Sequence, residues 1–360
     1  AWTGGKIYHG AEGKFSDAIS WDKQYSKKVG TPAPPPDKRY LHGLQDKFAY
    51  NPIVARLNDW APIEQSEEET NDWETAKRAA DFLQQDHDKP FFLAAGTFRP
   101  HLPWYAPQKY FDMHPLEDIE LPPYLESDLD DVPPIGLKMS GKTFDIVKEH
   151  GQWKSAIQGY LASTSFADAC LGVILDSLES SQYLDNTIVV LWGDHGWAIG
   201  EKHHWSKSAL WEETAKTTLT IRAPGVSTDN TRSKRTVSLI DLFPTLIELC
   251  GIPARDDLDG RSLAPLVRNP QMEWPYPAVI THSPFWYGVN HAVRSEEYHY
   301  ISYADGGEEL YDVAADPNGW TNLAGDPKYT GAKDDLRKWL PKINADPFPP
   351  NRPNPGRPKD

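Results

Sequence analysis

Four short segments of the chain combine residue types that bind anions or metal ions. Imidazole can exchange a proton near neutral pH, lysine is a mobile positive charge, and a carboxylate is a ligand for hard divalent cations. Together such groups could screen the oxygens of an anionic ester, activate a nucleophile and protonate a leaving group. The four segments are Gly5–His9, Arg99–Pro103, Gly193–Trp197 and His203–Lys207.

Each segment also has an ordinary explanation when it is taken alone. The pair Lys6 and His9 could be a surface feature, and a histidine flanked by prolines, such as His101, is often only a loop residue. Asp194 and His195 are stronger candidates for a metal or catalytic site because they directly follow an apolar run. Ligands gather outside the carboxyl ends of strands in open parallel sheets, so this position favours function.

Predicted strands and helices alternate around these segments. The apolar run Thr187–Trp192 is typical of a central parallel strand, and Pro90–Ala95 predicts another strand just before Arg99. Apolar periodicity predicts helices over Trp73–Asp86 and Trp153–Ser180. Thr218–Arg222 reads as a strand and Ser238–Cys250 as an amphipathic helix, which makes this part of the chain α/β.

The remaining sequence predicts a long loop and a second, smaller domain. Phe98 to Lys148 is rich in proline and acidic residues and is expected to be an irregular functional loop. Short strands are expected from Ala278 onwards, around a turn at Ser295–Glu297, and they indicate a small antiparallel subdomain. We therefore expect domains at residues 1–270 and 271–345, followed by a proline-rich tail at 346–360.

Composition limits the possible partners. The formal charge of −15 at pH 7 argues against nucleic acid or an anionic membrane surface as a partner of the whole molecule, so any anion site must be local. No run of about eighteen apolar residues occurs, and we expect no membrane span. Fourteen tryptophans suit stacking on sugars as well as core packing. Cys170 and Cys250 lie in apolar helical patterns without metal-type spacing, and both are expected to be buried thiols.

In their order and their neighbours, the four segments resemble the type I sulfatases of the alkaline phosphatase superfamily. The shared elements are Gly-Lys-x-x-His, a strand followed by Arg/Lys-Pro-His-x-Pro, a strand followed by Asp-His-Gly, and a lysine soon after. Phe91–Pro103 and Thr187–Lys207 look closest to iduronate 2-sulfatase, and the similarity extends into Asp241–Leu246 and Glu309–Leu323. The resemblance implies an alkaline phosphatase-like α/β fold, with a mixed, mostly parallel sheet flanked by helices and a smaller C-terminal antiparallel sheet.

The resemblance also implies a role for each candidate residue. Lys6 and Lys207 would contact the sulfate oxygens, His9 would act as the base that helps release sulfate, and His101 would contact the ester oxygen. Asp194 and His195 would bind Ca²⁺, for which the carboxylate is the safer ligand on chemical grounds. The residues that could contact the sugar or a neighbouring carboxylate are Arg99, Trp104, Trp197, His204, Trp286 and His291.

One family element is absent from the sequence. Sulfatases carry a Cys or Ser in the context Cys/Ser-x-Pro-x-Arg, which becomes formylglycine, and neither Cys170 nor Cys250 has that context. We expect this element, and an early acidic pair for the metal, in a segment of the same protein upstream of Ala1. The implied function is hydrolysis of a sulfated oligosaccharide by an exported enzyme, in a periplasmic, secreted or lysosomal-type compartment. A phosphoester or phosphonate hydrolase of the superfamily and a non-catalytic carbohydrate-binding relative are the alternatives.

Overall fold

The computed structural model describes residues 1–8, 18–25, 33–34, 36–40, 42–228, 230–283 and 288–344. His9, Trp286 and the predicted tail at 346–360 lie outside the described residues. The chain divides into two compact units, which are described separately. Unit 1 comprises the described parts of Ala1–Leu121 and Asp145–Asn186, and unit 2 those of Pro122–Phe144 and Thr187–Arg352. The domain limits expected at residues 270 and 345 stay predictions.

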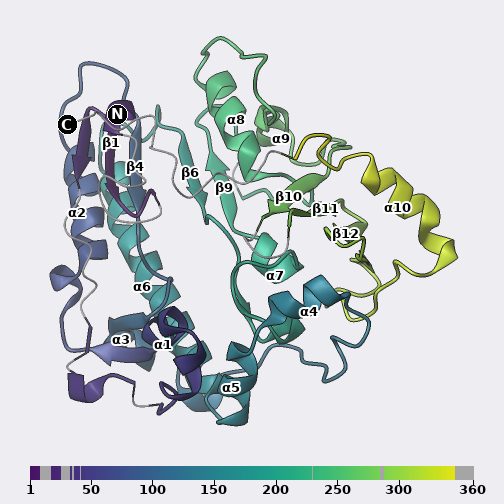
Figure 1. Cartoon of the computed structure of the whole chain (residues 1–360). Coiled ribbons are helices and arrows are strands. Elements are labelled where there is room, and N and C mark those ends of the chain that lie inside the picture. The colour runs from purple at the N-terminus through teal and green to yellow at the C-terminus, as the bar shows by residue number, and fades with distance from the viewer. Residues whose placement is uncertain are drawn as a thin grey trace, which may run out of the picture. The chain divides into compact units, whose positions relative to one another are not determined.

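A three-stranded parallel sheet forms the centre of unit 1. Its order is β2-β1-β4, with strands β1 (Trp2–Gly5), β2 (Lys23–Tyr25) and β4 (Leu93–Gly96). Helix α2 (Asn71–Leu83) contacts β1 and β4 and runs beside α6 (Trp153–Glu179), as Figure 1 shows. Both helices and the strand after Pro90 are close to the positions predicted from the sequence.

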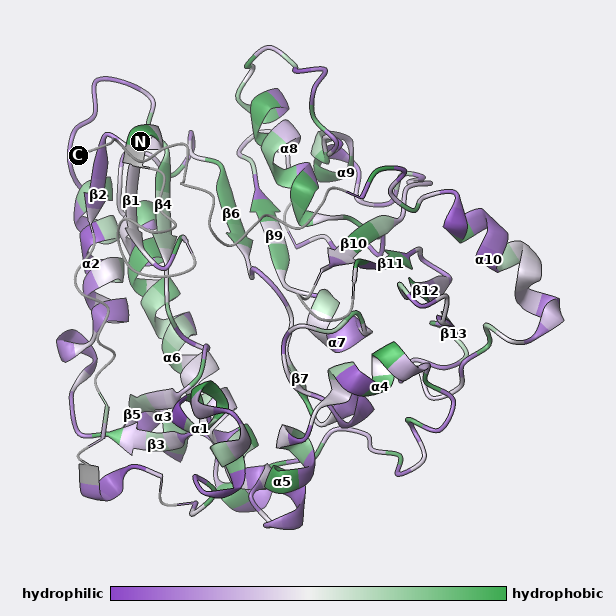
Figure 2. Cartoon of the chain, in the orientation of Figure 1, coloured by the Kyte–Doolittle hydropathy of each residue, from purple (hydrophilic) through white to green (hydrophobic). Residues whose placement is uncertain are grey.

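Helix α6 is the longest helix among the described residues and is largely apolar (Figure 2). By length and composition alone it could cross a membrane, which is a weak criterion because helices in folded cores also meet it. In unit 1 it packs against α2, α3 (Gln108–Asp112) and β5 (Trp104–Pro107). Phe166 and Cys170 on α6 are buried in that contact, and the prediction of a buried thiol at Cys170 is confirmed.

The prediction of an irregular loop from Phe98 to Lys148 was wrong. This segment contains α3 and β5, and β5 pairs in parallel with β3 (Trp60–Ile63). Helices α4 (Pro134–Ser140) and α5 (Thr143–Glu149) follow. Each element has only four to seven residues, which is too few to show a period between the prolines that surround it.

In unit 2, β6 (Val189–Trp192) pairs with β9 (Leu219–Arg222). The strand prediction is confirmed, but this pairing is antiparallel and not the parallel one expected. An apolar run suggests burial and does not reveal the direction of the neighbouring strand. In β6 even the burial is incomplete, because Leu191 and Trp192 are 38% and 49% exposed.

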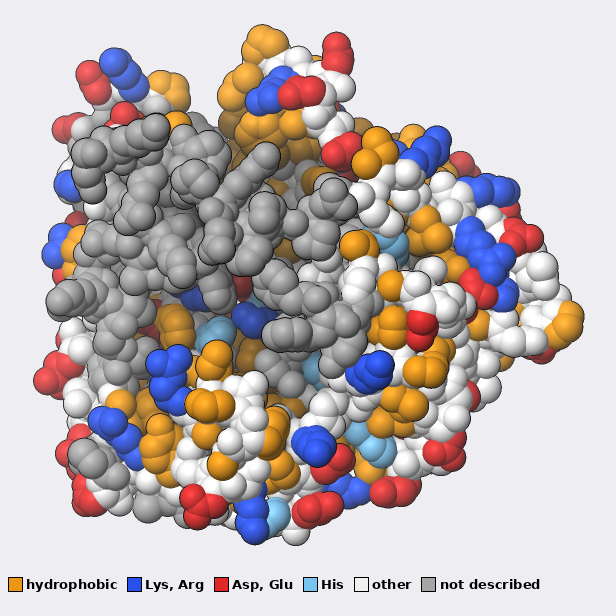
Figure 3. Space-filling model, viewed as in Figure 1, with side chains coloured by type: hydrophobic (Ala, Val, Ile, Leu, Met, Phe, Trp, Pro, Cys, Tyr) orange, Lys and Arg blue, Asp and Glu red, His pale blue; other side chains and the backbone are white. Residues whose placement is uncertain are grey.

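The predicted helix Ser238–Cys250 is a 3₁₀ turn, Leu239–Asp241, followed by α8 (Leu242–Leu249). Hydrophobic side chains gather over α8 at the molecular surface, where Ile240, Phe243 and Ile252 are more than half exposed (Figure 3). Cys250 is also exposed, so the prediction of a second buried thiol was wrong. The thiol lies at the end of the helix, beyond the buried face that Thr245 and Ile247 provide.

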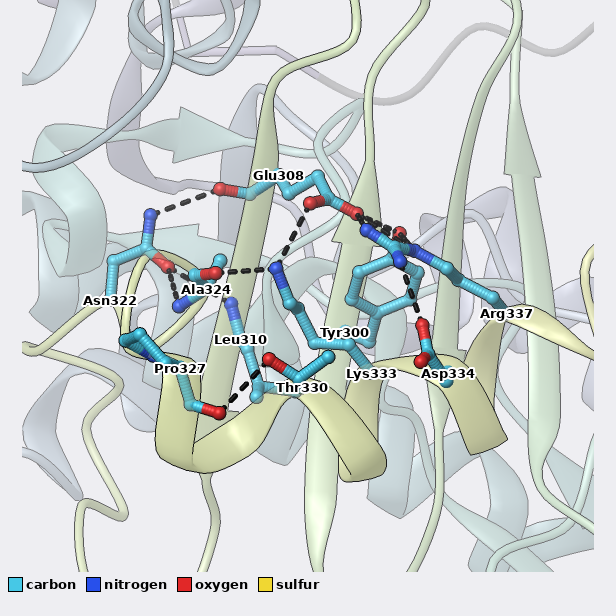
Figure 4. A network of polar contacts seen from close by, with 10 residues as sticks. All are labelled: Tyr300, Glu308, Leu310, Asn322, Ala324, Pro327, Thr330, Lys333, Asp334 and Arg337. Atoms are coloured by element: carbon cyan, nitrogen blue, oxygen red, sulfur yellow. Dashed lines mark hydrogen bonds and ion pairs between the residues drawn. The ribbon is translucent and has the colours of Figure 1, made fainter.

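The predicted C-terminal antiparallel sheet is confirmed. Strands β10 to β13 pair in sequence order, and Ser295 and Tyr298 close the predicted turn. Helix α10 (Thr330–Arg337) is anchored to this sheet by Glu308, which bonds Lys333 Nζ at 3.2 Å and Arg337 Nη2 at 2.6 Å (Figure 4). The strands are β10 (Ala278–His282), β11 (Asn290–Arg294), β12 (Tyr298–Ser302) and β13 (Glu308–Asp312).

Short elements complete the described chain. The remaining strands and α-helices are α1 (Pro52–Leu57), β7 (Ala198–Ile199), β8 (Trp205–Ser206), α7 (Glu212–Ala215) and α9 (Ala264–Arg268). The other 3₁₀ turns are Ala18–Ser20, Pro36–Lys38, Lys47–Tyr50, Glu67–Glu69, Leu116–Asp118, Glu201–His203 and Pro327–Tyr329.

Candidate active site

Lys6 and the loop that begins at Thr97 leave the same edge of the unit 1 sheet. Strands β1 and β4 are parallel and end in register, with Gly5 opposite Gly96. The amide of Lys6 donates to the carbonyl of Gly96 at 2.8 Å. A Cβ on Gly5 would lie 2.0 Å from the Gly96 oxygen, and Gly5 has a φ of +73°, so this close approach requires glycine. The fold therefore brings Lys6 next to the start of the Arg99–Pro103 segment.

His101 is partly exposed on this loop. Its Nδ1 lies 2.6 Å from the carbonyl oxygen of Leu102 and must carry a proton to bond it. In the neutral ring the lone pair is then on Nε2, and protonation would turn Nε2 into a second donor. This arrangement suits a group that passes a proton to or from an ester oxygen.

Arg99 lies behind the loop rather than on its surface. Its side chain is 2% exposed, with Nε donating to the Tyr105 carbonyl at 2.6 Å and Nη1 to the His101 carbonyl at 3.3 Å. The carboxylate of Asp72 accepts from the amides of Phe98 at 2.7 Å and Arg99 at 3.1 Å. These bonds tie the loop to α2 and fix the backbone on both sides of Pro100.

Burial and nearby charge have opposite effects on the pKa values of Arg99 and Asp72. Burial lowers the pKa of Arg99 to about 10, against the raising effect of Asp72, so the guanidinium stays charged at neutral pH. Burial also raises the pKa of Asp72, while Arg99 and the two amides lower it. Sequence reasoning missed Asp72, because an acidic residue in the first turn of a helix is ordinary.

Trp104 supports the same loop from within the core. It is fully buried, its Nε1 donates to the Pro100 carbonyl at 2.9 Å, and its ring packs on Trp60 and Tyr160. A sugar contact by Trp104 would require this ring to become accessible.

Asp194 and His195 follow β6 in unit 2. The Nδ1 of His195 lies 2.7 Å from the Gly196 carbonyl oxygen, which assigns the proton to Nδ1 and the lone pair to Nε2. Nε2 lies 3.5 Å from Oδ1 of Asp194, and the Asp194 side chain is 56% exposed. Two ligands that each lie about 2.4 Å from one Ca²⁺ are separated by roughly this distance.

These two residues fit part of a metal site. Within the described ranges, no group of three or more His, Cys, Asp or Glu side chains could hold a metal ion. A calcium ion takes about six to eight ligands, so Asp194 and His195 alone would not complete a site for it. Glycine permits the tight path of this segment, because a Cβ on Gly196 would lie 2.0 Å from the Glu213 carbonyl oxygen.

The short hairpin β7–β8 brings Lys207 back towards the end of β6. Ala198 pairs with Ser206, so Lys207 and Trp197 occupy the same end of the hairpin. Both side chains are partly buried, and the Trp197 ring lies 6.1 Å from that of His195. Unit 2 therefore brings together Asp194, His195, Trp197 and Lys207.

Two other predicted sugar contacts are buried in unit 2. The ring nitrogens of His204 lie 3.1 Å from the Ser140 carbonyl oxygen and 3.0 Å from that of Lys207. Those of His291, on β11, lie 3.0 Å from Thr281 Oγ1 and from Asn344 Oδ1. A sugar contact by either histidine would require these bonds to break.

Comparison with known proteins identifies the family of the chain. The family model "Sulfatase" matches residues 14–252, and the model "N-sulphoglucosamine sulphohydrolase, C-terminal" matches residues 200–346. A protein of Formosa agariphila named "Sulfatase" is 37% identical over 351 residues. The match covers 95% of this chain but 66% of the relative, so the chain spans slightly less than two thirds of that protein.

Solved structures share the fold. A structure determined in complex with its substrate, D-glucosamine-2-N,6-O-disulfate, has a TM-score of 0.61 at 21% identity and covers 75% of this chain and 68% of its own. The phosphonate monoester hydrolase of Agrobacterium radiobacter has a TM-score of 0.68 at 23% identity, over 77% of this chain and 61% of its own. The first family model spans more than half of the chain, and the expected alkaline phosphatase-like α/β fold is confirmed. The chain belongs to the sulfatase family.

Proposed function

We propose that this chain is the larger part of an enzyme that hydrolyses sulfate esters of a sulfated saccharide. The observation that carries the proposal is the sulfatase-family match over residues 14–252. The saccharide class is supported by the N-sulphoglucosamine sulphohydrolase model and by the fold neighbour solved with a disulfated glucosamine. Within unit 1, Lys6 and His101 are partly exposed, and within unit 2, Asp194 is exposed and Lys207 partly exposed, so each unit offers polar groups to a ligand.

The proposed roles follow the resemblance of each segment and are given for each unit by itself. Lys6 in unit 1 and Lys207 in unit 2 are each proposed as a positive charge that neutralises sulfuryl oxygens, which lowers the repulsion of an incoming nucleophile. His101 donates a proton from Nε2 to the departing sugar oxygen, and His9 acts as the base that helps release sulfate. Trp197, the most accessible of the described tryptophans proposed to bind substrate, contacts the sugar, as does Trp286.

Asp194 and His195 are the proposed ligands for a calcium ion, which would neutralise charge on the sulfate. Asp194 would provide the oxygen that a hard cation prefers, and His195 would bind through Nε2 in the tautomer that its Nδ1 bond to Gly196 favours. Formylglycine would supply the nucleophile. Neither cysteine has the required context, so we propose that a segment of the same protein outside residues 1–360 carries it. We also propose that the enzyme is exported.

The test is a substrate panel on the complete protein after its mass spectrum has located a formylglycine. The panel compares sulfated disaccharides of defined sulfate position, their desulfated forms, and a phosphonate monoester. Release of sulfate that depends on Lys207 and Asp194 supports the proposal. Saccharide binding without sulfate release would instead identify a carbohydrate-binding relative.

Phosphonate monoester hydrolysis is the second candidate. It is favoured by the fold neighbour from Agrobacterium radiobacter, which has the higher TM-score of the two structures compared above. Faster turnover of the phosphonate than of every sulfate ester in the panel would select this function.

A further inference from the structure

The backbone that carries Lys207 is unusually strained. Between Lys202 and Ser208, four residues other than glycine have positive φ angles: 51° at Lys202, 46° at His203, 91° at Ser206 and 77° at Ser208. Such conformations are unfavourable for residues other than glycine and persist only where the surrounding contacts impose them. Ser206 and Ser208 flank Lys207 directly, so contacts within unit 2 must hold this lysine in place.

A buried ion pair anchors the start of this loop. The Nζ of Lys202, which is 3% exposed, lies 2.6 Å from Oδ1 of Asp128 and also donates to the Gly319 carbonyl. His203 bonds the Leu125 carbonyl through Nε2 at 3.0 Å. These contacts fix the loop at Lys202 and His203, which are five and four residues before Lys207. The backbone at Lys207 must be held by other contacts.

His204 makes the contact at Lys207 itself. It is 5% exposed, with Nε2 lying 3.0 Å from the carbonyl oxygen of Lys207 and Nδ1 lying 3.1 Å from that of Ser140 at the end of α4. A neutral imidazole has one N–H and can serve one of these two carbonyls fully. Which carbonyl receives that bond decides whether His204 holds Lys207 or holds α4.

We infer that His204 is a positioning residue, which donates from Nε2 to the Lys207 carbonyl and thereby fixes the backbone from which the Lys207 side chain reaches its anion. This inference rests on the proposed function for the role of Lys207. Burial lowers the pKa of His204, against the raising effect of its bonds to backbone carbonyls, and thereby favours the neutral ring, in which only one carbonyl receives a hydrogen bond. His204 thus acts through Lys207 and does not touch the sugar.

Two substitutions separate the contacts of the ring. The amide nitrogen of glutamine reaches the position of Nε2, and that of asparagine the position of Nδ1. His204→Gln keeps a donor for Lys207, whereas His204→Asn keeps one for Ser140. In the complete enzyme we expect His204→Asn to lower kcat by about tenfold or more and His204→Gln to stay within about threefold of wild type. The exposed His150→Asn serves as the control.

The opposite order, or equal activity of both variants, would overturn the inference. Thermal unfolding of each variant shows whether a loss of activity is only a loss of folded protein. A purely structural role through Ser140 would make His204→Gln the more damaging change.

A second readout needs no turnover. Lysines are labelled by reductive ¹³C-methylation, and the Lys207 resonance is assigned from Lys207→Arg. We expect it to shift and sharpen in His204→Asn but not in His204→Gln, with the exposed Lys154 unchanged in both. Identical Lys207 resonances in the three proteins would refute the positioning role. If the wild type hydrolyses no sulfate ester, the proposed function fails while this measurement still decides the inference.

Discussion

Oδ1 of Asp194 and Nε2 of His195 lie 3.5 Å apart at the end of β6, with the His195 proton held on Nδ1 by Gly196. The two atoms are placed as neighbouring ligands of one cation would be. In the proposed calcium site the remaining ligands would come from other groups, and Asp194 would supply the carboxylate oxygen that a hard cation prefers.

We expect Asp194→Ala to lower calcium affinity and sulfate-ester turnover by at least about 100-fold. Equilibrium dialysis measures the affinity, and turnover is measured after chelation and after restoring Ca²⁺. Asp185→Ala, at an exposed turn, is the matched control. Turnover of Asp194→Ala that matches wild type after metal restoration would remove Asp194 from the site.

The buried Asp72 gives a prediction for stability. Removing its charge leaves Arg99 buried with less compensation and removes the acceptor for two loop amides. We expect Asp72→Ala to lower the free energy of unfolding by roughly 3–5 kcal/mol, as measured by urea denaturation. The double variant Asp72→Ala/Arg99→Met should recover part of this loss, since the uncompensated charge is gone. Additive losses would mean that the two charges do not interact.

Positions at strand ends could be predicted from the sequence, because an apolar run followed by polar residues marks the end of a strand. This reasoning placed His101 and Asp194 correctly after β4 and β6, whereas β1 before Lys6 was not predicted. It also found the turn between β11 and β12 at Ser295. The local pattern was sufficient in each case.

The burial of charged residues could not be predicted in this way. The backbone amide of buried Arg99 donates to Asp72, 27 positions earlier in the chain, and Lys202 forms an ion pair with Asp128, 74 positions earlier. A partner at such a distance leaves no mark near the residue, so Arg99 and His204 resembled exposed ligand contacts. For the same reason, no local pattern distinguished Cys250 at a helix end from the buried Cys170.

The contacts that Glu308 makes with α10 give a second prediction for stability. Glu308 accepts hydrogen bonds from Tyr300, Arg337 and Lys333, and these lower its pKa despite the raising effect of burial. We expect Lys333→Met to cost about 1 kcal/mol in unfolding free energy at pH 7. The cost should shrink as the pH falls and Glu308 becomes protonated. Lys338→Met, in an exposed pair with Asp335, should change stability by less. Equal effects of the two substitutions would show that Glu308 does not anchor the helix.

Glu213 gives a pH-dependent prediction in which stability falls as the pH rises, whereas the contribution of Glu308 grows. Burial, helped by repulsion from Glu201 and Glu212, raises its pKa from 4.5 to about 7. Below pH 4.5 the carboxyl is protonated in both folded and unfolded chains and costs nothing. Between pH 4.5 and 7 only the unfolded chain ionises, so stability falls as the pH rises.

Glu213→Gln removes this ionisation. We expect the variant to match wild type near pH 4.5 and to be more stable by roughly 3 kcal/mol above pH 7, where the full cost of the raised pKa applies. Unfolding free energies measured in urea between pH 4.5 and 8 follow the difference. Glu273→Gln, at an exposed position, should leave the pH profile unchanged. A stability difference that is flat across this range would mean that Glu213 titrates alike in the folded and unfolded chains.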